Sequence, residues 1–243
     1  MDLAGRVAVV TGGGRRLGRA MAVALGARGM RVVVHYGTSS TEAEATAAAI
    51  RAGGGEALVV QADLADEGAV RRLIPAAVER FGRVDVLVNS AAIFEPGGVA
   101  DTTSAAWDRH FAINLKAPFL LSQTFAAHLA PDATGKIVNV SDWRGCRPDA
   151  TYLAYTLTKA ALMTLTQALA VALAPRVQVN CLALGAILLP AGADATYRER
   201  LLAQIPARRL GTPDDVVRAL LFLLEHDYLT GEVLLVDGGR HLV

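Results

Sequence analysis

This chain of 243 residues has few cysteines and almost no net charge, and each of these facts counts against certain classes of protein. The two cysteines, Cys146 and Cys181, form no disulfide or metal-ligand pattern, so we expect reduced thiols, a cytoplasmic location and no bound metal. A formal net charge of +1, with both signs interspersed, favours neither a nucleic-acid partner nor a membrane surface. The first apolar run, residues 7–10, is far too short for a signal peptide or a membrane span.

Internal repeats and low-complexity linkers are absent from the sequence as well. Hydrophobic residues make up 53% of the chain, which suits a tightly packed α/β protein better than a disordered one. The length is sufficient for one domain with a full core. We therefore expect residues 1–243 to form a single domain.

Seven short runs rich in β-branched and aliphatic residues alternate with segments of helical periodicity. The runs cover residues 6–11, 31–36, 56–61, 84–89, 136–142, 176–182 and 232–237. This alternation predicts a Rossmann fold, with a seven-stranded, parallel, doubly wound sheet and helices on both faces. Ligands bind such sheets at the carboxyl ends of the strands, where the strand order reverses. Four polar residues stand at such ends: Thr11, Asp63, Asn89 and Asp142.

A glycine-rich turn, residues 12–18, separates the first strand from a helical segment that ends at Gly29. Glycines allow backbone N–H groups to approach a pyrophosphate, and the start of the helix adds its positive end. Any tight turn uses glycine, so the position after the first strand of an alternating chain carries this interpretation.

The end of the second strand, residues 35–39, contains no carboxylate. An acid at that position usually selects NAD by binding the adenosine ribose. Its absence, with Arg15 and Arg16 in the neighbouring turn, favours the additional phosphate of NADPH. Ser39 and Glu42 also have the spacing of a capping box for the helix that follows, and both roles are compatible.

Tyr155 and Lys159 are four residues apart in an apolar segment without glycine or proline. A helix places both side chains on one face. We expect the ammonium to lower the pKa of the phenol, which would make Tyr155 a general acid or base near neutral pH. The same spacing is also compatible with an ordinary helix surface.

Two further positions keep alternatives open, and one segment has a single interpretation. Asp63 is predicted either to contact adenine or to cap the helix that begins near Asp66. Asn114 lies inside a helical region, residues 104–129, so its amide is either hydrogen-bonded locally or functional. Residues 184–209 carry glycine and proline, and we interpret them as a lid over the substrate.

With these residues in place, the sequence resembles the short-chain dehydrogenase/reductase family over essentially its whole length. The matching motifs are Thr11-Gly12-x-x-x-x-x-Gly18, Asp63-Leu64, Asn89-x-Ala91, Asn114, Tyr155-x-x-x-Lys159 and the glycine-rich end of the chain, residues 230–239. The resemblance implies hydride transfer from NAD(P)H, with Tyr155 as proton donor, Lys159 on the nicotinamide ribose and Asn114 supporting a relay water. It also implies a homotetramer, in which helices 104–129 and 152–174 pair between subunits.

The resemblance further implies a set of cofactor contacts. They are Gly12, Arg15, Arg16, Leu17, His35, Tyr36, Ser39, Asp63, Leu64, Asn89, Ala91, Tyr155, Lys159, Gly185 and Ile187.

Three departures from the family pattern narrow the subfamily. Arg16 replaces the middle glycine of the turn, Asp142 replaces the serine expected 13 residues before the tyrosine, and Leu184 replaces a proline. The first two, with residues 35–36 and 94–96, resemble pteridine reductases and the related dihydromonapterin or dihydrofolate reductases. In those enzymes the arginine contacts cofactor phosphate and pterin, a phenylalanine (here Phe94) stacks on the pterin, and the tyrosine–aspartate pair handles protons. Ala92 and Thr38 depart from the eukaryotic pteridine reductases.

The change to Asp142 has a chemical rationale. An ionised carboxylate would repel the negative charge that develops on a carbonyl oxygen, whereas a pterin presents N–H donors and is reduced at a C=N bond. The alternative is that Ser141 supplies the hydroxyl, because a slip of one residue turns a strand side chain to the other face. Phe94 is either a core aromatic or a stacking platform, and Trp143 either lines the pocket or packs below it.

The sequence thus predicts an NADPH-dependent reductase of a small pterin-like substrate. Two rival hypotheses remain: a carbonyl, 3-oxoacyl or alcohol oxidoreductase of the same fold, and a non-catalytic NADPH-binding sensor or scaffold.

Overall fold

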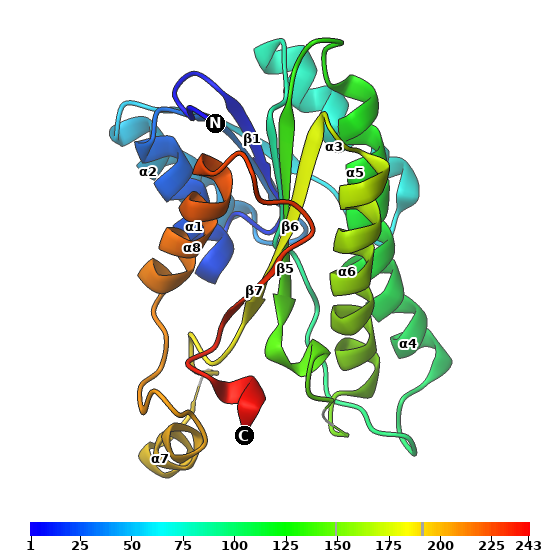
Figure 1. Cartoon of the computed structure of the whole chain (residues 1–243), viewed down its shortest axis with the longest axis vertical. Coiled ribbons are helices and arrows are strands. Elements are labelled where there is room, and N and C mark those ends of the chain that lie inside the picture. Colours follow the sequence, from blue (N-terminus) through cyan, green and yellow to red (C-terminus); the bar gives the residue numbers. More distant parts are fainter. Residues whose placement is uncertain (149, 191) are drawn as a thin grey trace.

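The central sheet contains seven parallel strands in the order β3-β2-β1-β4-β5-β6-β7 (Figure 1). The computed structural model describes residues 1–148, 150–190 and 192–243. The strands are β1 (Val7–Val10), β2 (Arg31–Tyr36), β3 (Glu56–Gln61), β4 (Val86–Asn89), β5 (Gly135–Asp142), β6 (Val177–Leu184) and β7 (Val233–Val236). Every predicted strand is confirmed, with ends that differ by at most two residues. The strand order confirms the predicted doubly wound Rossmann fold.

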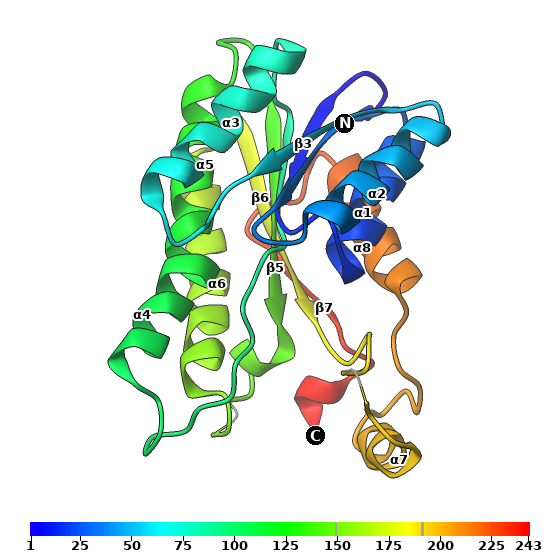
Figure 2. The same cartoon turned by 180° about the vertical axis from the view of Figure 1, so that it is seen from behind.

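Helices cover both faces of the sheet. One face carries α1 (Arg16–Ala27), α2 (Ser40–Ala52) and α8 (Pro213–Glu225). The other face carries α3 (Glu67–Phe81), α5 (Ala117–His128) and α6 (Leu153–Ala172), with α4 (Ser104–Phe111) beside α6, as Figure 2 shows from behind.

The strand β1 shows why the strands of this sheet have continuous apolar sequences. Val7 and Val9 are buried in the core cluster on the α3, α5 and α6 side. Ala8 and Val10 are buried in the cluster on the α1 and α8 side. A central parallel strand has two covered faces, so both sets of alternating side chains are apolar.

The predicted helical region 104–129 is confirmed to within one residue, but it is not α-helical throughout. A π-helical turn, residues Ala112–Lys116, separates α4 from α5 and contains Asn114. One additional residue per turn displaces the backbone locally, and such turns concentrate at functional sites.

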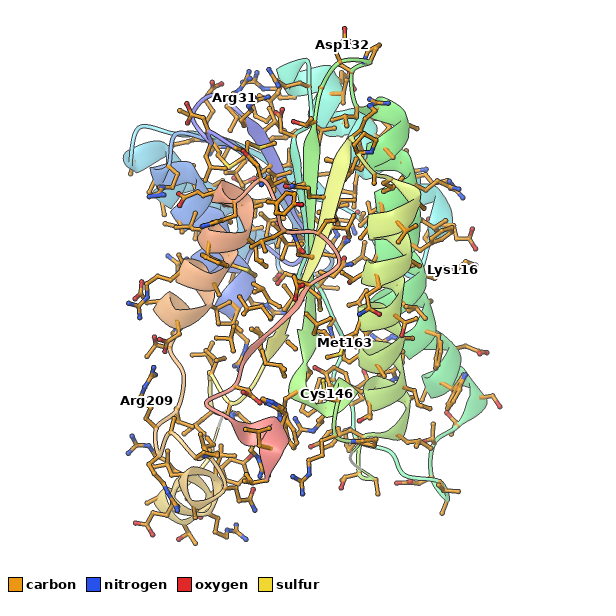
Figure 3. All side chains as sticks on the ribbon, in the orientation of Figure 1. Arg31, Lys116, Asp132, Cys146, Met163 and Arg209 are labelled. Carbon is orange, nitrogen blue, oxygen red and sulfur yellow. The ribbon has the colours of Figure 1, made fainter. Side chains whose placement is uncertain are left out.

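The carboxyl ends of the strands meet at one edge of the sheet, and several short segments lie beyond it. They are the 3-10 turns at Trp143–Gly145 and Arg240–Leu242 and the helix α7 (Ala195–Ala203), all at the bottom of Figure 1. Ala191, which belongs to the predicted lid, lies outside the described residues. Both cysteines are free thiols, as expected. The sulfur atoms of Cys146 and Met163, two residues labelled in Figure 3, are 3.8 Å apart.

Candidate active site

The side chains of the last two residues of β5 contact different groups of α6. The Ser141 hydroxyl donates a hydrogen bond to the carbonyl oxygen of Lys159, at 2.9 Å. The Asp142 carboxylate accepts one from the Tyr155 hydroxyl, at 3.1 Å between the phenol oxygen and Oδ2. The side chain that meets the phenol is therefore Asp142, and the alternative based on Ser141 does not hold.

Tyr155 and Lys159 lie on the buried face of α6, one turn apart. The Lys159 ammonium donates to the carbonyl oxygen of Val140, at 2.7 Å, and lies 5.6 Å from the centre of the Tyr155 ring. This bond to the end of β5 fixes the ammonium below the phenol. The pair is thus part of a rigid interior, and the interpretation as an ordinary helix surface does not hold.

The prediction that Lys159 lowers the pKa of Tyr155 is wrong for this protein. Burial, followed by the negative charge and the hydrogen bond of Asp142, raises the pKa of Tyr155 well above its usual value, while Arg144 opposes the rise. Burial also lowers the pKa of Lys159 to about 8. The sequence spacing revealed the lysine but not the burial of the phenol or the carboxylate bonded to it, and these dominate.

Asn114 links the loop after β4 to the Tyr155 helix. Its side-chain oxygen accepts a hydrogen bond from the backbone N–H of Ile93 at 2.9 Å. Its side-chain nitrogen donates to the Ile93 carbonyl at 3.0 Å and to the Thr158 hydroxyl at 3.2 Å. The amide is therefore bonded to residues that are distant in the sequence, and it sets the position of this loop relative to Tyr155.

The turn after β1 has the shape that a pyrophosphate requires. Gly12 adopts φ +65, and a Cβ atom on Gly18 would lie 2.1 Å from the Gly12 carbonyl oxygen, so these positions demand glycine. The Thr11 hydroxyl accepts from the backbone N–H groups of Ser90 and Ala91, at 2.9 and 3.0 Å, and holds the turn against β4. Helix α1 begins at Arg16, inside the predicted turn, and the side chain of its N-cap residue, Arg15, makes no hydrogen bond to the first amides of the helix. The turn and these amides fit a dinucleotide phosphate.

The side chain of His35, one of the predicted cofactor contacts, supports the turn from below. It is buried; Nδ1 accepts from the Gly12 N–H at 3.1 Å, and Nε2 lies 3.0 Å from the Ala62 carbonyl oxygen. Both ring nitrogens are thus engaged by the backbone. The imidazole therefore positions the glycine turn, and a cofactor contact of His35 stays a prediction.

The predicted capping box at Ser39 is also wrong. Ser39 occupies the N-cap of α2, but among the described residues its hydroxyl makes no cap hydrogen bond. Glu42 instead forms an ion pair with Arg15, with 3.8 Å between the charged atoms. The Ser39 hydroxyl therefore does not complete the capping box, and Glu42 extends toward the glycine turn.

Arg16 connects the glycine turn to the predicted lid. Its backbone has φ +50, a left-handed conformation that favours glycine, which is the residue it replaces in the family pattern. Its guanidinium donates to the carbonyl oxygen of Leu188 at 3.3 Å. Two other residues of this segment are predicted cofactor contacts. Gly185 lies too close to Asp237 for any side chain, and the side chain of Ile187 is buried.

Two further predicted contacts lie at the ends of β3 and β4. The Asp63 carboxylate accepts from the Ala65 N–H at 2.9 Å, whereas the cap of α3 is Asp66, so the capping alternative for Asp63 is wrong. Asn89 donates to the Asn139 side chain at 2.8 Å, and its own side-chain oxygen is buried with no partner among the described residues. Leu64 directly follows Asp63, and Ala91 lies two residues after Asn89.

An aromatic wall stands beside the phenol. Phe94 is 49% exposed, so it is not a core residue; it stacks on Tyr152 with ring centres 4.2 Å apart and meets Tyr155 edge-on at 4.6 Å. Trp143 is buried. The guanidinium of Arg144 lies 5.5 Å from the centre of the Phe94 ring and 5.0 Å from that of Trp143.

Sequence reasoning did not identify Tyr152 or Arg144. Tyr152 precedes Tyr155 by three residues, and this helical spacing was a usable signal. No pattern in the sequence distinguishes Arg144 from the other arginines. Within the described residues, no helix is both long and apolar enough to cross a membrane, and no cluster of three metal-ligating side chains is found.

Comparisons with known proteins agree with this geometry. The sequence model of a family described as enoyl-(acyl carrier protein) reductase matches residues 13–241. The chain is 37% identical to a granaticin polyketide synthase putative ketoacyl reductase of Streptomyces violaceoruber, over 98% of this chain and 96% of that protein. It is 36% identical to a 3-oxoacyl-[acyl-carrier-protein] reductase of Synechocystis, over 98% and 97% of the two chains.

Among solved structures, the crystal structure of the alternative dihydrofolate reductase FolM of Brucella canis, complexed with NADP, superposes with a TM-score of 0.94. It is 38% identical and covers 100% of this chain and 96% of that chain. The match over nearly the whole length, together with the buried Tyr155–Lys159 pair and the glycine turn, places the chain in the short-chain dehydrogenase/reductase family of NAD(P)-dependent oxidoreductases.

Proposed function

We propose that this protein is an NADPH-dependent reductase of a dihydropterin, a dihydrofolate or a similar nitrogen heterocycle. The observation that carries the proposal is the hydrogen bond between the Tyr155 phenol and the Asp142 carboxylate, where a carbonyl reductase of this family has a serine hydroxyl. A carboxylate next to the reacting atom disfavours a developing oxyanion and suits a substrate that presents N–H donors.

The choice of NADPH rests on the turn and on the end of β2. Arg15 and Arg16 are exposed beside the glycine turn, and β2 ends at Tyr36 without a carboxylate. Guanidinium groups bind phosphate oxygens well, so this end of the site favours the phosphorylated cofactor. The solved relatives that carry NADP support the same choice.

The remaining contacts are proposed from the positions of the residues around the turn and the strand ends. The pyrophosphate would lie on the Gly12 turn and the first amides of α1, near Leu17. Lys159 would hold the nicotinamide ribose. The other proposed contacts are Ser39, Asp63, Leu64, Asn89, Ala91, Gly185 and Ile187.

NADPH supplies a hydride to the carbon of the substrate C=N bond when it is bound. The chain then supplies the proton. Tyr155 carries it in the resting state, because burial and Asp142 raise its pKa, and it donates this proton to the ring nitrogen. Asp142 accepts a hydrogen bond from a substrate N–H, and Phe94 offers an exposed ring face for stacking. One hydride and one proton reduce the double bond.

Residues 184–209 are proposed to form the substrate lid. None of the residues of α7 is buried, and the segment is linked to the site by the Arg16–Leu188 hydrogen bond. Segments with few buried contacts open at low cost in free energy. We also propose a homotetramer, and light scattering of the purified protein measures the assembly directly.

Of the two rivals, the carbonyl reductase has support from relatives whose names describe ketoacyl reductases. The test is NADPH oxidation with 7,8-dihydromonapterin, dihydrobiopterin and dihydrofolate, compared with ketones and 3-oxoacyl thioesters, with Tyr155→Phe as the inactive control. Turnover of the pterins supports the proposal. Turnover of the carbonyl compounds alone refutes the pterin substrate and leaves a reductase, and tight NADPH binding without any turnover favours the non-catalytic sensor.

A further inference from the structure

Arg144 contacts the carboxylate that Tyr155 contacts, from the opposite oxygen. Asp142 Oδ1 accepts a hydrogen bond from the Arg144 backbone N–H at 2.9 Å and lies 3.5 Å from its guanidinium nitrogen Nη1. Oδ2 accepts from the Tyr155 phenol at 3.1 Å. Both carboxylate oxygens of Asp142 therefore face hydrogen-bond donors: the backbone N–H and guanidinium of Arg144 at Oδ1, and the Tyr155 phenol at Oδ2.

The guanidinium of Arg144 is enclosed by aromatic rings. Its centre lies 5.5 Å from the Phe94 ring, 5.0 Å from Trp143 and 5.5 Å from Tyr152. Its side chain is 22% exposed and that of Asp142 is 16% exposed. A cation over ring faces is attracted by them, and away from bulk water its charge acts more strongly on its neighbours. This arginine is therefore not an ordinary solvated surface side chain.

We propose that Arg144 is a positioning residue of the reaction: its guanidinium holds Asp142 Oδ1, so that Oδ2 remains aimed at the Tyr155 phenol and at the substrate. The inference rests on the proposed role of the Asp142–Tyr155 pair, but it does not depend on which substrate is reduced. Without the guanidinium, the carboxylate keeps one backbone hydrogen bond and gains freedom to rotate away from the phenol.

The charged groups around the Tyr155 phenol also affect its pKa. Asp142 faces Tyr155 from β5, Lys159 from its own helix and Arg144 from the turn after β5, while Cys181 on β6 lies near Lys159. Arg144 opposes the rise in the pKa of Tyr155 that burial and Asp142 cause. Removal of its charge therefore raises the pKa of Tyr155 further, and the oxidation direction, which needs the phenolate, shifts to higher pH.

The test is a double-mutant cycle of Arg144→Gln and Asp142→Asn, measured as kcat and KM on whichever substrate the parent reduces best. Glutamine removes the guanidinium and leaves the backbone N–H bond to Asp142 in place. Arg144→Lys restores the charge, and Arg147→Gln, at an exposed arginine of the same loop, is the matched control.

We expect Arg144→Gln to lower kcat about 10- to 100-fold, the effect of losing one charge-assisted contact, with KM and NADPH affinity changed less than about 3-fold. Arg144→Lys should recover most of the loss, and Arg147→Gln should match the parent. In the Asp142→Asn background, Arg144→Gln should change kcat less than about 3-fold, because it acts through Asp142.

Three outcomes would overturn the inference. They are an unchanged kcat in Arg144→Gln, a loss that persists undiminished in the Asp142→Asn background, and an effect confined to KM, which would make Arg144 a direct substrate ligand. Failure of the proposed substrate is a separate result. If only carbonyl compounds are reduced, the pterin assignment fails, and the same cycle measured on those compounds still decides the role of Arg144.

Discussion

Asp142 and Tyr155 share a hydrogen bond in which the phenol is the donor, at 3.1 Å. The proton therefore resides on Tyr155, and the raised pKa of this residue keeps it there across the neutral range. A buried phenol that holds its proton is ready to donate it when the substrate accepts a hydride. The resting state of the site is thus prepared for reduction, which agrees with the proposed direction of the reaction.

Replacement of Asp142 by serine tests the choice of substrate. We expect Asp142→Ser to lower kcat/KM for dihydropterins by about 100-fold and to raise it for ketones, because a neutral donor replaces a carboxylate beside the reacting atom. Steady-state kinetics on both substrate classes measure the change. Ser141→Ala controls for the neighbouring hydroxyl and should keep most of the activity, since Ser141 points to the Lys159 backbone. Equal losses on both substrate classes in Asp142→Ser would contradict this prediction.

Lys159 predicts an alkaline dependence of stability. Its folded pKa is lowered to about 8 by burial, whereas an unfolded lysine titrates near ~10.4. Between these values the unfolded chain binds more protons than the folded one, so stability rises with pH in that window. Urea unfolding measures this: between about pH 7 and about pH 10, the free energy of unfolding of the parent should rise by on the order of 1–3 kcal/mol relative to that of Lys159→Met. A constant difference between the two proteins would exclude this contribution.

Arg15 predicts the cofactor preference. It is exposed beside the glycine turn and pairs with Glu42 at 3.8 Å. We expect Arg15→Gln to weaken NADPH binding about 10-fold and to leave NADH binding nearly unchanged, because the lost guanidinium would face the additional phosphate. Fluorescence titration of both cofactors measures this, with Arg19→Gln on the exposed side of α1 as control. A parallel loss for both cofactors would place Arg15 elsewhere on the dinucleotide.

Asp85 predicts a stability effect far from the site. Its buried carboxylate accepts from the Arg6 guanidinium at 3.0 Å, the Val7 N–H at 2.9 Å and the Arg83 Nε at 2.8 Å. We expect Asp85→Ala to lower the free energy of unfolding by about 3–5 kcal/mol, since the change leaves these donors unpaired. Urea denaturation measures it. Asp132→Ala, at the exposed residue labelled in Figure 3, should change the value by less than about 0.5 kcal/mol.

The fold could be predicted because its signals are local. Both sets of alternating side chains in strands such as β1 are apolar, and this pattern identified every strand of the sheet. The interruption of the helix at Asn114 was only partly visible. An amide at that position signalled an exception, but the sequence does not contain the long-range bonds to Ile93 and Thr158 that accompany the π-helical turn.

The site could be located from the sequence, but its electrostatics could not. Motif spacing brought Tyr155, Lys159 and Asp142 together, and the structure has them in contact or one turn apart. The sign of the Tyr155 pKa shift was wrong because it depends on burial and on the distance to each charge, which are tertiary quantities. Arg144 was missed for the same reason, since its importance comes from the rings that surround it.

The contact between His35 and Gly12 has a consequence for the tolerance of the protein to acid. The ring nitrogen that receives the Gly12 N–H must carry no proton, and burial lowers the pKa of His35 below its ordinary value. The imidazole therefore stays neutral, and the loop above it keeps its shape, to a lower pH than an ordinary histidine would allow. A dinucleotide would find the same loop over that wider range of pH.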